Sequence, residues 1–132
     1  MSIEKIYDAK NVSVVVDGRV VQGFQDNDMV TATQKEENVQ TAVDAQGEAQ
    51  IAINNNKLGQ ITINLSGNSA DHKRLNKLAN TKKVFPVTIK SDIEKVTAQQ
   101  CIISKPADAA YGKAVPGRTY TIEALEIHIE AV

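Results

Sequence analysis

The chain has 132 residues, which favours a single domain, and 42% of them are hydrophobic, as in a globular protein. Fifteen Lys and Arg residues against sixteen Asp and Glu residues give a net charge of −1, so the chain as a whole is not a basic nucleic-acid or membrane binder. The single cysteine excludes an intramolecular disulfide framework, and the lack of Trp, with two Phe and three Tyr, argues against an aromatic stacking surface.

No segment of the sequence reads as a targeting or membrane element. The longest apolar runs, such as residues 14–16, are far too short to cross a bilayer. The N-terminal Met-Ser-Ile-Glu-Lys lacks the apolar stretch of a secretory signal peptide. There is also no internal repeat and no linker, so we expect one domain over residues 1–132, without a membrane anchor.

Short segments with a hydrophobic period of two dominate the first half of the chain. Asp17-Gly18 is typical of a tight hairpin turn between two strands. A run of turn-forming residues, 54–59, separates two later strands and predicts that these form an antiparallel hairpin, with Ile51 and Ile53 on one of its faces. The strands predicted in this half are 12–16, 19–22, 29–34, 48–54 and 60–65.

One short helix is predicted, over about residues 69–80. Asn68 or Ser69 can cap it, Asp71 complements its N-terminus, and an apolar stripe follows at helical spacing. The C-terminal part continues with strands at 85–89, 95–104 and 118–132, and with a loop at 105–117.

The final strand changes the phase of its alternation between Ile122 and Leu125, which predicts a β-bulge there. Strands do not alternate with helices along the chain, so parallel βαβ units are not indicated. The sequence predicts a mainly β protein, an antiparallel β-sandwich or barrel of about seven or eight strands with one short α-helix.

The sequence offers no catalytic constellation. His128 has Glu126 and Glu130 at period two, which fits a metal or acid–base cluster or, more simply, a mixed-charge strand face. Cys101 lies in an apolar run, where a buried thiol is expected rather than a nucleophile. No glycine-rich phosphate loop is present. We expect a protein that is not an enzyme and that binds no cofactor or metal.

Charge is distributed unevenly along the chain. Residues 24–67 carry six acidic and two basic residues, a net charge of −4, which leaves ten acidic and thirteen basic residues elsewhere, a net of +3. Five of the basic residues fall within 73–83, on the predicted helix. Such a chain is suited to contacts between copies of itself, acidic part to basic part. Ordinary scatter, a solvated helix face, or contact with nucleic acid or acidic lipid are the alternatives.

The polar faces of the two middle strands carry no charge: Gln50, Ala52 and Asn54 on one, and Gln60, Thr62 and Asn64 on the other. Exposed sheet faces usually carry Lys and Glu, which also protect strand edges. Small uncharged side chains suit a sheet that pairs with neighbouring copies or faces a polar channel, although an ordinary exposed face remains the alternative.

Residues 34–48 are long for a connection and mostly polar. We interpret them as an arm that becomes ordered against a neighbouring subunit. Its candidate interface residues are Lys35, Glu36, Glu37, Asn38 and Asp44.

The chain resembles the tail tube proteins of contractile phages and phage-like bacteriocins. The resemblance runs over almost the full length, although none of its cues is a catalytic signature. The cues are Tyr-Asp-Ala-Lys-Asn-Val-Ser-Val-Val-Val-Asp-Gly (7–18), Val-Gln-Gly-Phe (21–24), Asp-Asn-Asp (26–28), Gly-Glu-Ala (47–49), Ser-Gly-Asn-Ser (66–69), Lys-Pro-Ala-Asp-Ala-Ala-Tyr-Gly (105–112) and Arg-Thr-Tyr-Thr-Ile-Glu (118–123).

This resemblance implies a structural subunit of a hollow tube. Hexameric rings would join their inner strands into one continuous barrel and stack into a conduit for DNA or for puncture of an envelope. It implies sheath, baseplate and tape-measure proteins as partners, DNA passing without specific binding, and a place in a virion tail or phage-like particle assembled in the bacterial cytoplasm. Candidate lumen-facing residues are Gln50, Asn54, Gln60, Thr62 and Asn64, and candidate outer, sheath-facing residues are Lys73, Arg74 and Lys77.

Two other assignments remain open at this point. A small single-stranded nucleic-acid-binding β-barrel would use the lysines of the helix and loops, although aromatic residues for base stacking are scarce. The ring protein of a type VI secretion system is similar in architecture, but its members are usually longer than this chain.

Overall fold

A computed structural model describes residues 7–26 and 28–132. The first six residues of the predicted 1–132 domain, and the central residue of the 26–28 cue, lie outside the described part of the chain. The elements are a 3-10 turn (Ala9–Asn11), β1 (Ser13–Val16), β2 (Arg19–Val20), β3 (Val30–Gln34), β4 (Val39–Val43), β5 (Ala49–Ile53), β6 (Gly59–Ser66), α1 (Ala70–Thr81), β7 (Phe85–Lys90), β8 (Glu94–Ile103), β9 (Gly117–Ala124) and β10 (His128–Ala131).

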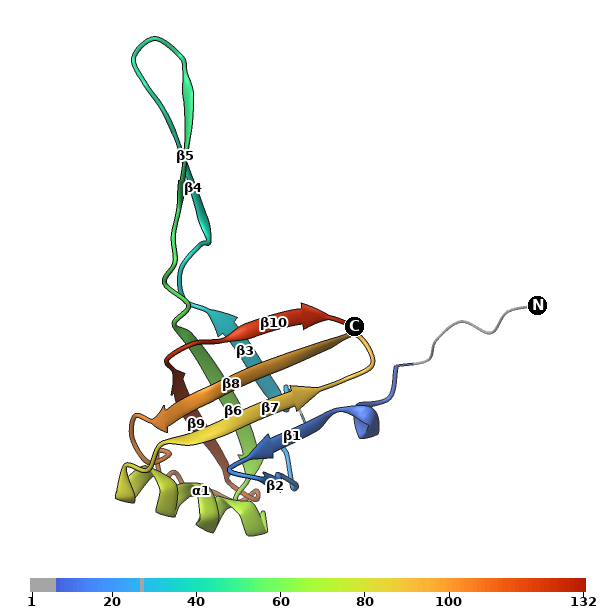
Figure 1. Cartoon of the computed structure of the whole chain (residues 1–132). Helices are drawn as coiled ribbons and strands as arrows, with labels where there is room; N and C mark the ends of the chain where they lie inside the picture. Colours follow the sequence, from blue (N-terminus) through green and yellow to red (C-terminus); the bar gives the residue numbers. More distant parts are fainter. Residues whose placement is uncertain (1–6, 27) are drawn as a thin grey trace, which may run out of the picture.

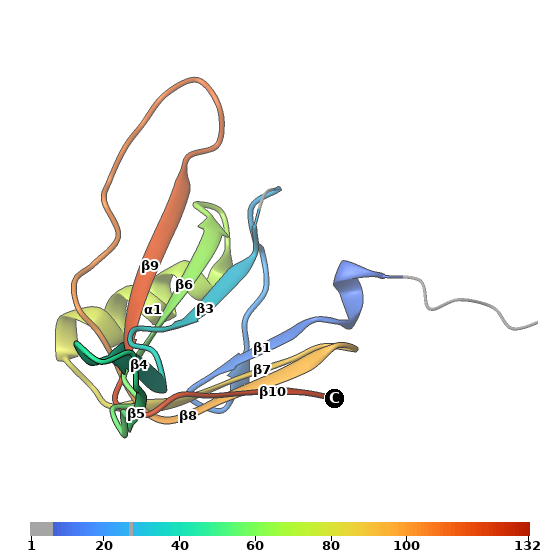
Figure 2. The ribbon, with the colours of Figure 1, turned by 90° about the horizontal axis from the view of Figure 1, so that it is seen from above.

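Eight strands form one antiparallel sheet in the order β2-β1-β7-β8-β9-β6-β3, with β10 paired to β8. The sheet is bent into two layers (Figure 1), one made of β1, β2, β7, β8 and β10 and the other of β3, β6 and β9. The layers are joined where residues 101–103 of β8 pair with residues 122–124 of β9, and they diverge from that junction (Figure 2). The predicted mainly β, antiparallel sandwich with one helix is confirmed.

The core fills the space between the two layers. Alternate residues of β6, Ile61, Ile63 and Leu65, are fully buried, because side chains at period two point to one face of a strand. They meet the inward side chains of β1, β7, β8 and β9, among which Phe85 and Tyr120 are the largest.

The helix α1 covers one end of this sandwich, as Figure 1 shows. The hydroxyl of Ser69 caps its N-terminus by accepting a hydrogen bond from the N–H of Asp71 at 3.2 Å, as predicted. Its buried side chains are the predicted stripe Leu75, Leu78 and Ala79. Gly23 permits this packing, because a Cβ atom there would lie 2.7 Å from the side chain of Ser69.

The predicted hairpin between residues 48–54 and 60–65 is wrong. β5 pairs with β4, a strand that lies inside the segment expected to be an irregular arm, and β6 pairs with β3 and β9. The run at 54–59 does not reverse the chain tightly. The side chains of Asn54 and Asn56 instead accept hydrogen bonds from the N–H groups of Asn56 and Leu58, both at 3.0 Å, and guide the chain from the arm into the sheet.

The predicted bulge between Ile122 and Leu125 is also wrong. The phase change marks the end of β9, after which the chain crosses to pair β10 with the other half of β8. Leu125 donates its N–H to the carbonyl of Gln100 and Ile127 to that of Lys57, so two hydrogen bonds guide this crossing. The strand expected at 19–22 is shorter and covers only Arg19–Val20.

The corrected pairing makes opposite predictions for two isoleucines. Ile63→Ala should lower the free energy of unfolding by about 3 kcal/mol, because it leaves a cavity in the core. Ile51→Ala should change it by less than about 0.5 kcal/mol in the monomer, because Ile51 on β5 is 72% exposed. Urea denaturation at low protein concentration measures both values. Equal losses would contradict the separation of β5 from the core.

Candidate assembly surfaces

The most prominent surface feature is a two-stranded arm that projects from the body (Figure 1). It comprises residues 35–58, with β4 and β5 paired in the middle and a turn at 44–48. Every residue of β4 and β5 is exposed. The arm therefore contains residues 35–48 of the predicted segment as its first limb and tip, whereas Gln34 ends β3. Its second limb includes residues 49–54, which were predicted to form a strand of the sheet.

The arm has one apolar face. Cross-strand pairing places Val39 opposite Ile53 and Thr41 opposite Ile51. The apolar side chains on this face are exposed by 46% to 74%: Val39, Val43, Ile51 and Ile53. An isolated two-stranded hairpin is marginally stable in water, and β-branched residues usually line a surface that is covered. The arm therefore exposes an apolar face of a kind that is usually covered.

Polar contacts hold the root of the arm to the body. The Glu36 carboxylate accepts hydrogen bonds from the side-chain amides of Asn54 at 2.8 Å and Asn56 at 3.1 Å, which ties the two limbs together. Lys35 forms an ion pair with Glu123 of β9.

The return limb is fixed in the same region, at the start of β6. Ile127 packs against Gly59, where a Cβ atom would lie 2.4 Å from its side chain. The N–H of Ile127 also bonds to the carbonyl of Lys57. The direction of the arm is therefore set by both of its ends.

The outward face of β3, β6 and β9 is polar and almost uncharged. In-register pairing aligns Thr31, Thr62 and Thr121 in one row across the three strands. Among the strand residues of this face in the described chain, Glu123 alone is charged, and it is paired with Lys35. The polar side chains of this face include Thr31, Thr33, Gln60, Thr62, Asn64, Ser66, Thr119, Thr121 and Glu123.

The sheet ends in an open strand, β3, which pairs with β6 and with no other strand among the described residues. Met29 accepts from the N–H of Asn64, and Lys35 donates to the carbonyl of Leu58, so odd-numbered residues of β3 face β6. The backbone groups of Val30, Ala32 and Gln34 consequently point to the free edge. This edge carries no charge, no proline and no bulge, the usual devices that prevent strand pairing.

The exposed side of α1 is basic. Lys73 and Lys77 are exposed and lie about half a turn from the buried stripe, so they point away from the body. Arg74 is different, because its guanidinium bonds to the carboxylate of Asp71 at 3.1 Å and to the carbonyl of Val16 at 2.6 Å. Its side chain is 18% exposed and fastens the β1–β2 hairpin to the helix.

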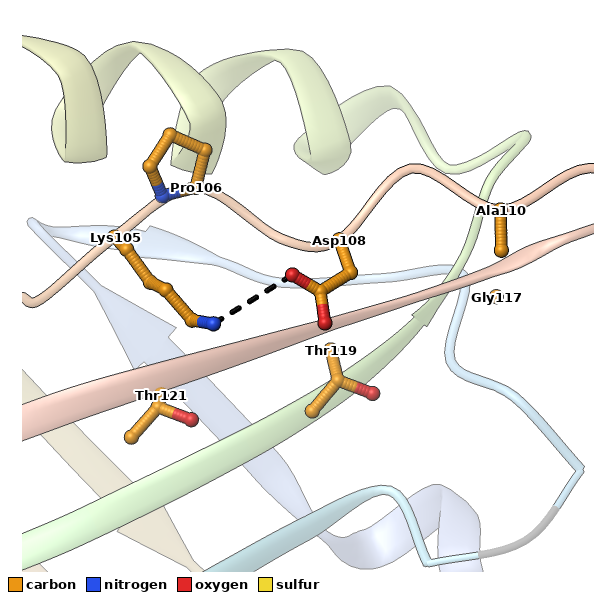
Figure 3. Close-up of a pocket in the computed structure, with 7 residues that line it drawn as sticks. All are labelled: Lys105, Pro106, Asp108, Ala110, Gly117, Thr119 and Thr121. Carbon is orange, nitrogen blue, oxygen red and sulfur yellow. Dashed lines mark ion pairs between the residues drawn. The ribbon is translucent and has the colours of Figure 1, made fainter.

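A cavity of about 370 Å³ lies between the loop at 104–116 and β9 (Figure 3). Its polar lining comes from Thr119 and Thr121 of β9 and from the ion pair between Lys105 and Asp108, whose charged atoms are 3.5 Å apart. These two charged side chains are 71% and 90% exposed. The cavity is thus an open extension of the polar face.

The buried side chain of Arg118 binds the loop at 104–116. Its guanidinium donates to the carbonyls of Ala110 at 3.2 Å and Gly117 at 2.7 Å, and it lies 5.1 Å from the ring centre of Tyr111. Since these partners are carbonyls and an aromatic ring, the cation is used to shape the loop.

The reactive side chains of Cys101 and Tyr120 are packed inside the protein. Cys101 is buried, as predicted, and burial raises the pKa of its thiol to about 11, despite an opposing hydrogen bond to the backbone of Val87. Burial likewise raises the pKa of Tyr120, whose hydroxyl lies 2.7 Å from Nδ1 of His72.

The His128 imidazole lies 3.2 Å from the carboxylate of Glu126 at the surface. Over residues 7–26 and 28–132, no group of three or more His, Cys, Asp or Glu residues is arranged to hold a metal ion. Among the described helices, none combines the length and hydrophobicity that a membrane crossing requires.

The structure separates some of the predicted site residues. Lys35, Glu36, Glu37 and Asn38 lie at the root of the arm, and Asp44 lies at its tip. The five candidate lumen residues divide into Gln60, Thr62 and Asn64 on the polar face and Gln50 and Asn54 on the arm. The sequence analysis missed the threonines of β3 and β9 that complete this face. Their period-two spacing at 31, 33, 119 and 121 was the available signal.

Comparison with solved structures identifies the fold. A chain from the anti-feeding prophage cap (AFP tube terminating cap) gives a TM-score of 0.66 at 12% identity, covering 100% of this chain and 95% of that one. A chain from the PVC sheath-tube complex of an extracellular contractile injection system gives 0.65 at 14% identity, covering 98% and 95%. A chain from the virion of a native gene transfer agent particle gives 0.68 at 12% identity, covering 96% and 99%.

The fold is one found in contractile injection systems. No protein-family model matches the chain, and no curated protein matches it in sequence. At identities of 12% to 14% the comparisons establish the fold. The predicted resemblance to tail tube proteins is thereby confirmed at that level.

The arm root predicts a difference between adjacent glutamates. Glu36→Ala removes the acceptor shared by two side-chain amides, so the arm should open more often. Trypsin cleavage after Lys57, which neither substitution adjoins, should then become about fivefold faster. Glu37→Ala is the matched control, because the Glu37 side chain has no hydrogen bond or ion pair within the described residues. Equal cleavage rates, followed by mass spectrometry, would contradict the role of Glu36.

Proposed function

We propose that the protein is a non-enzymatic structural subunit of a hollow tail tube, whose copies form hexameric rings that stack into a conduit. The observation that carries this proposal is the open, unprotected edge of β3 beside the uncharged face of β3, β6 and β9. A soluble protein that leaves such an edge free risks uncontrolled pairing, whereas closure of a ring removes the edge. The shared fold with components of contractile injection systems supports the same role.

In this tube the polar face of β3, β6 and β9 lines the lumen. Hydroxyl and amide side chains hydrate the wall, and the two lysines beside them, Lys35 and Lys105, are paired with Glu123 and Asp108. Little unpaired positive charge is therefore left for a passing phosphate backbone. Gln60, Thr62 and Asn64 are the predicted lumen residues that remain in this assignment. Gln50 and Asn54 belong to the arm and are not assigned to the lumen.

The arm then joins one ring to the next. Its apolar face would be covered by a neighbouring subunit, which supplies the packing that an isolated hairpin lacks. Sheath, baseplate and tape-measure proteins, and DNA that passes without specific binding, are the remaining proposed partners. A virion tail or phage-like particle assembled in the bacterial cytoplasm is the proposed location.

A single-stranded nucleic-acid-binding barrel is the second candidate. The exposed lysines of α1 are the observation that favours it. The exposed aromatic side chains of the described chain, Tyr7 and Tyr111, lie outside α1, and Tyr120 is buried, so the helix itself offers no stacking surface. Oligonucleotide binding that weakens steeply with salt, by a monomer that never forms rings, would favour this candidate over the tube.

The tube proposal predicts assembly that depends on the arm. Negative-stain electron microscopy across a concentration series should show rings and hollow tubes of uniform width. Replacing residues 38–54 with Gly-Gly should leave rings but prevent stacking, because the contact between rings is removed. Full-length tubes from the shortened chain would contradict the role of the arm.

Point variants separate the two faces of the arm in the same assay. Ile51→Ser with Ile53→Ser changes the apolar face and should shorten or abolish tubes. Gln40→Ala with Gln50→Ala changes the opposite face equally conservatively and should leave tubes as in the wild type. Identical behaviour of the two pairs would argue against docking through the apolar face.

The edge of β3 predicts a proline variant that folds but does not form rings. The N–H of Ala32 points away from β6, so Ala32→Pro removes a donor from the free edge and preserves the β3–β6 pairing. The monomer should unfold at nearly the wild-type urea midpoint, whereas rings should disappear from micrographs. Thr33→Pro, on the side that bonds β6, should instead destabilise the monomer. Abundant rings from Ala32→Pro would show that β3 is not a ring contact.

A further inference from the structure

The molecule has two chemically opposite ends. The arm rises from one end of the sandwich, and α1 lies across the other end, with the core between them (Figure 1). The view from above agrees, because the arm comes toward the viewer while α1 lies behind the strands (Figure 2). A chain of this shape carries different surfaces at its two ends.

The arm end is acidic. The arm, residues 35–58, carries four acidic side chains and two lysines, and both lysines, Lys35 and Lys57, lie at its root. Asp44 and Glu48 flank the turn at the tip, and Glu37 lies near the root. Asp44 also accepts hydrogen bonds from the N–H groups of Gln46 and Glu48, at 2.9 and 3.0 Å, so the turn has a defined shape. The tip therefore presents negative charge on an ordered hairpin beside the apolar face of the arm.

The α1 end is basic and carries exposed apolar side chains. Lys73 and Lys77 point away from the body, and Lys82 follows at the C-cap. Val20 of β2 and Val84, between α1 and β7, are 53% and 56% exposed. Arg74 joins α1 to the β1–β2 hairpin through the carbonyls of Val16 and Arg19, so these parts form one surface. We call it the helix end.

We propose that the arm of one copy docks on the helix end of a second copy, with the acidic tip against Lys73 and Lys77 and the apolar arm face against the exposed valines. The two surfaces match in both charge and hydrophobicity, which favours this partner and this orientation. Because the donor and acceptor surfaces are different, the contact does not close on itself but repeats from copy to copy along an axis.

This inference rests on the proposed tube function and makes it specific. It assigns Lys73 and Lys77 to contacts between rings, where the sequence analysis had expected a sheath. It also explains why Arg74, which is used internally, does not belong to the same docking surface. A sheath would find these lysines free at the terminal ring only.

Disulfide trapping tests the contact directly. A chain with Gln46→Cys at the tip and Lys77→Cys on α1 should, on mild oxidation, give a ladder of dimers, trimers and higher species on a non-reducing gel. The native Cys101 is 1% exposed and should not take part. Gln46→Cys with Lys95→Cys is the matched control, because Lys95 is exposed on β8 away from the helix end, and it should give no ladder. Absence of the ladder in the first chain, or equal ladders in both, would overturn the proposal.

Charge reversal supplies an independent readout that also separates this proposal from the tube function. Lys73→Glu with Lys77→Glu should raise the protein concentration needed for tube growth by roughly tenfold, because exposed ion pairs are each worth a fraction of a kcal/mol. Lys90→Glu with Lys95→Glu changes the net charge equally and should have little effect. Adding Glu48→Lys at the tip of the arm restores an opposite-charge pair and should recover part of the growth.

The outcomes are distinct. Wild-type tubes together with normal growth of Lys73→Glu/Lys77→Glu would overturn the docking proposal and leave the tube function intact. A wild-type protein that remains monomeric at every concentration, together with no ladder from the Gln46→Cys/Lys77→Cys chain, would overturn both. Loss of sheath binding with unchanged tube growth would assign the lysines to a sheath instead.

Discussion

The whole fold depends on a short stretch of strand pairing between β8 and β9. Only residues 101–103 and 122–124 are in register there, yet this contact joins the two layers into one sheet. Both segments alternate buried and partly exposed residues, with Cys101 and Ile103 facing Ile122 and Ala124 in the core. The same bend that encloses the core turns the other side of β3, β6 and β9 outward as a smooth polar face. Core formation and the exposure of that face are consequences of one junction.

An open sheet has edge strands whose backbone groups are free to pair with another strand. At one end β2 has two residues, and β10 is short and carries a histidine and a glutamate, so both offer poor templates for pairing. At the other end β3 is five residues long, uncharged and unprotected. Within the described chain, β3 is therefore the free edge best suited to pair with another strand.

The sequence was sufficient where local patterns agree with the final structure. The helix was predicted from its capping residue, Ser69, and from the spacing of its apolar residues, of which Leu75 is buried. The core strands were predicted from alternation with a period of two, as at the buried Ile61. It was insufficient for the arm. Ile51 and Ile53 have the alternation of a core strand, and nothing local distinguishes burial within one chain from burial against another. The strand at 39–43 was not predicted because the residues around it are mostly polar. The hydrogen bond of Arg74 to the carbonyl of Val16 joins residues far apart in the sequence, so local spacing could not predict it.

The wrong sequence-based prediction for β5 is itself informative. β5 has the composition of a core strand, yet Ile51 and Ile53 are 72% and 74% exposed. Its sequence pattern therefore conflicts with its place in the monomer. Natural sequences keep such conflicts where another requirement outweighs them, and a partner surface removes the conflict without any change in the chain. The acidic charge on the same arm and the basic charge at the opposite end give that partner surface a sign. In the proposed docking, the hydrophobic pattern of the arm calls for a partner surface, and the charges at the two ends favour a second copy in the same orientation as that partner.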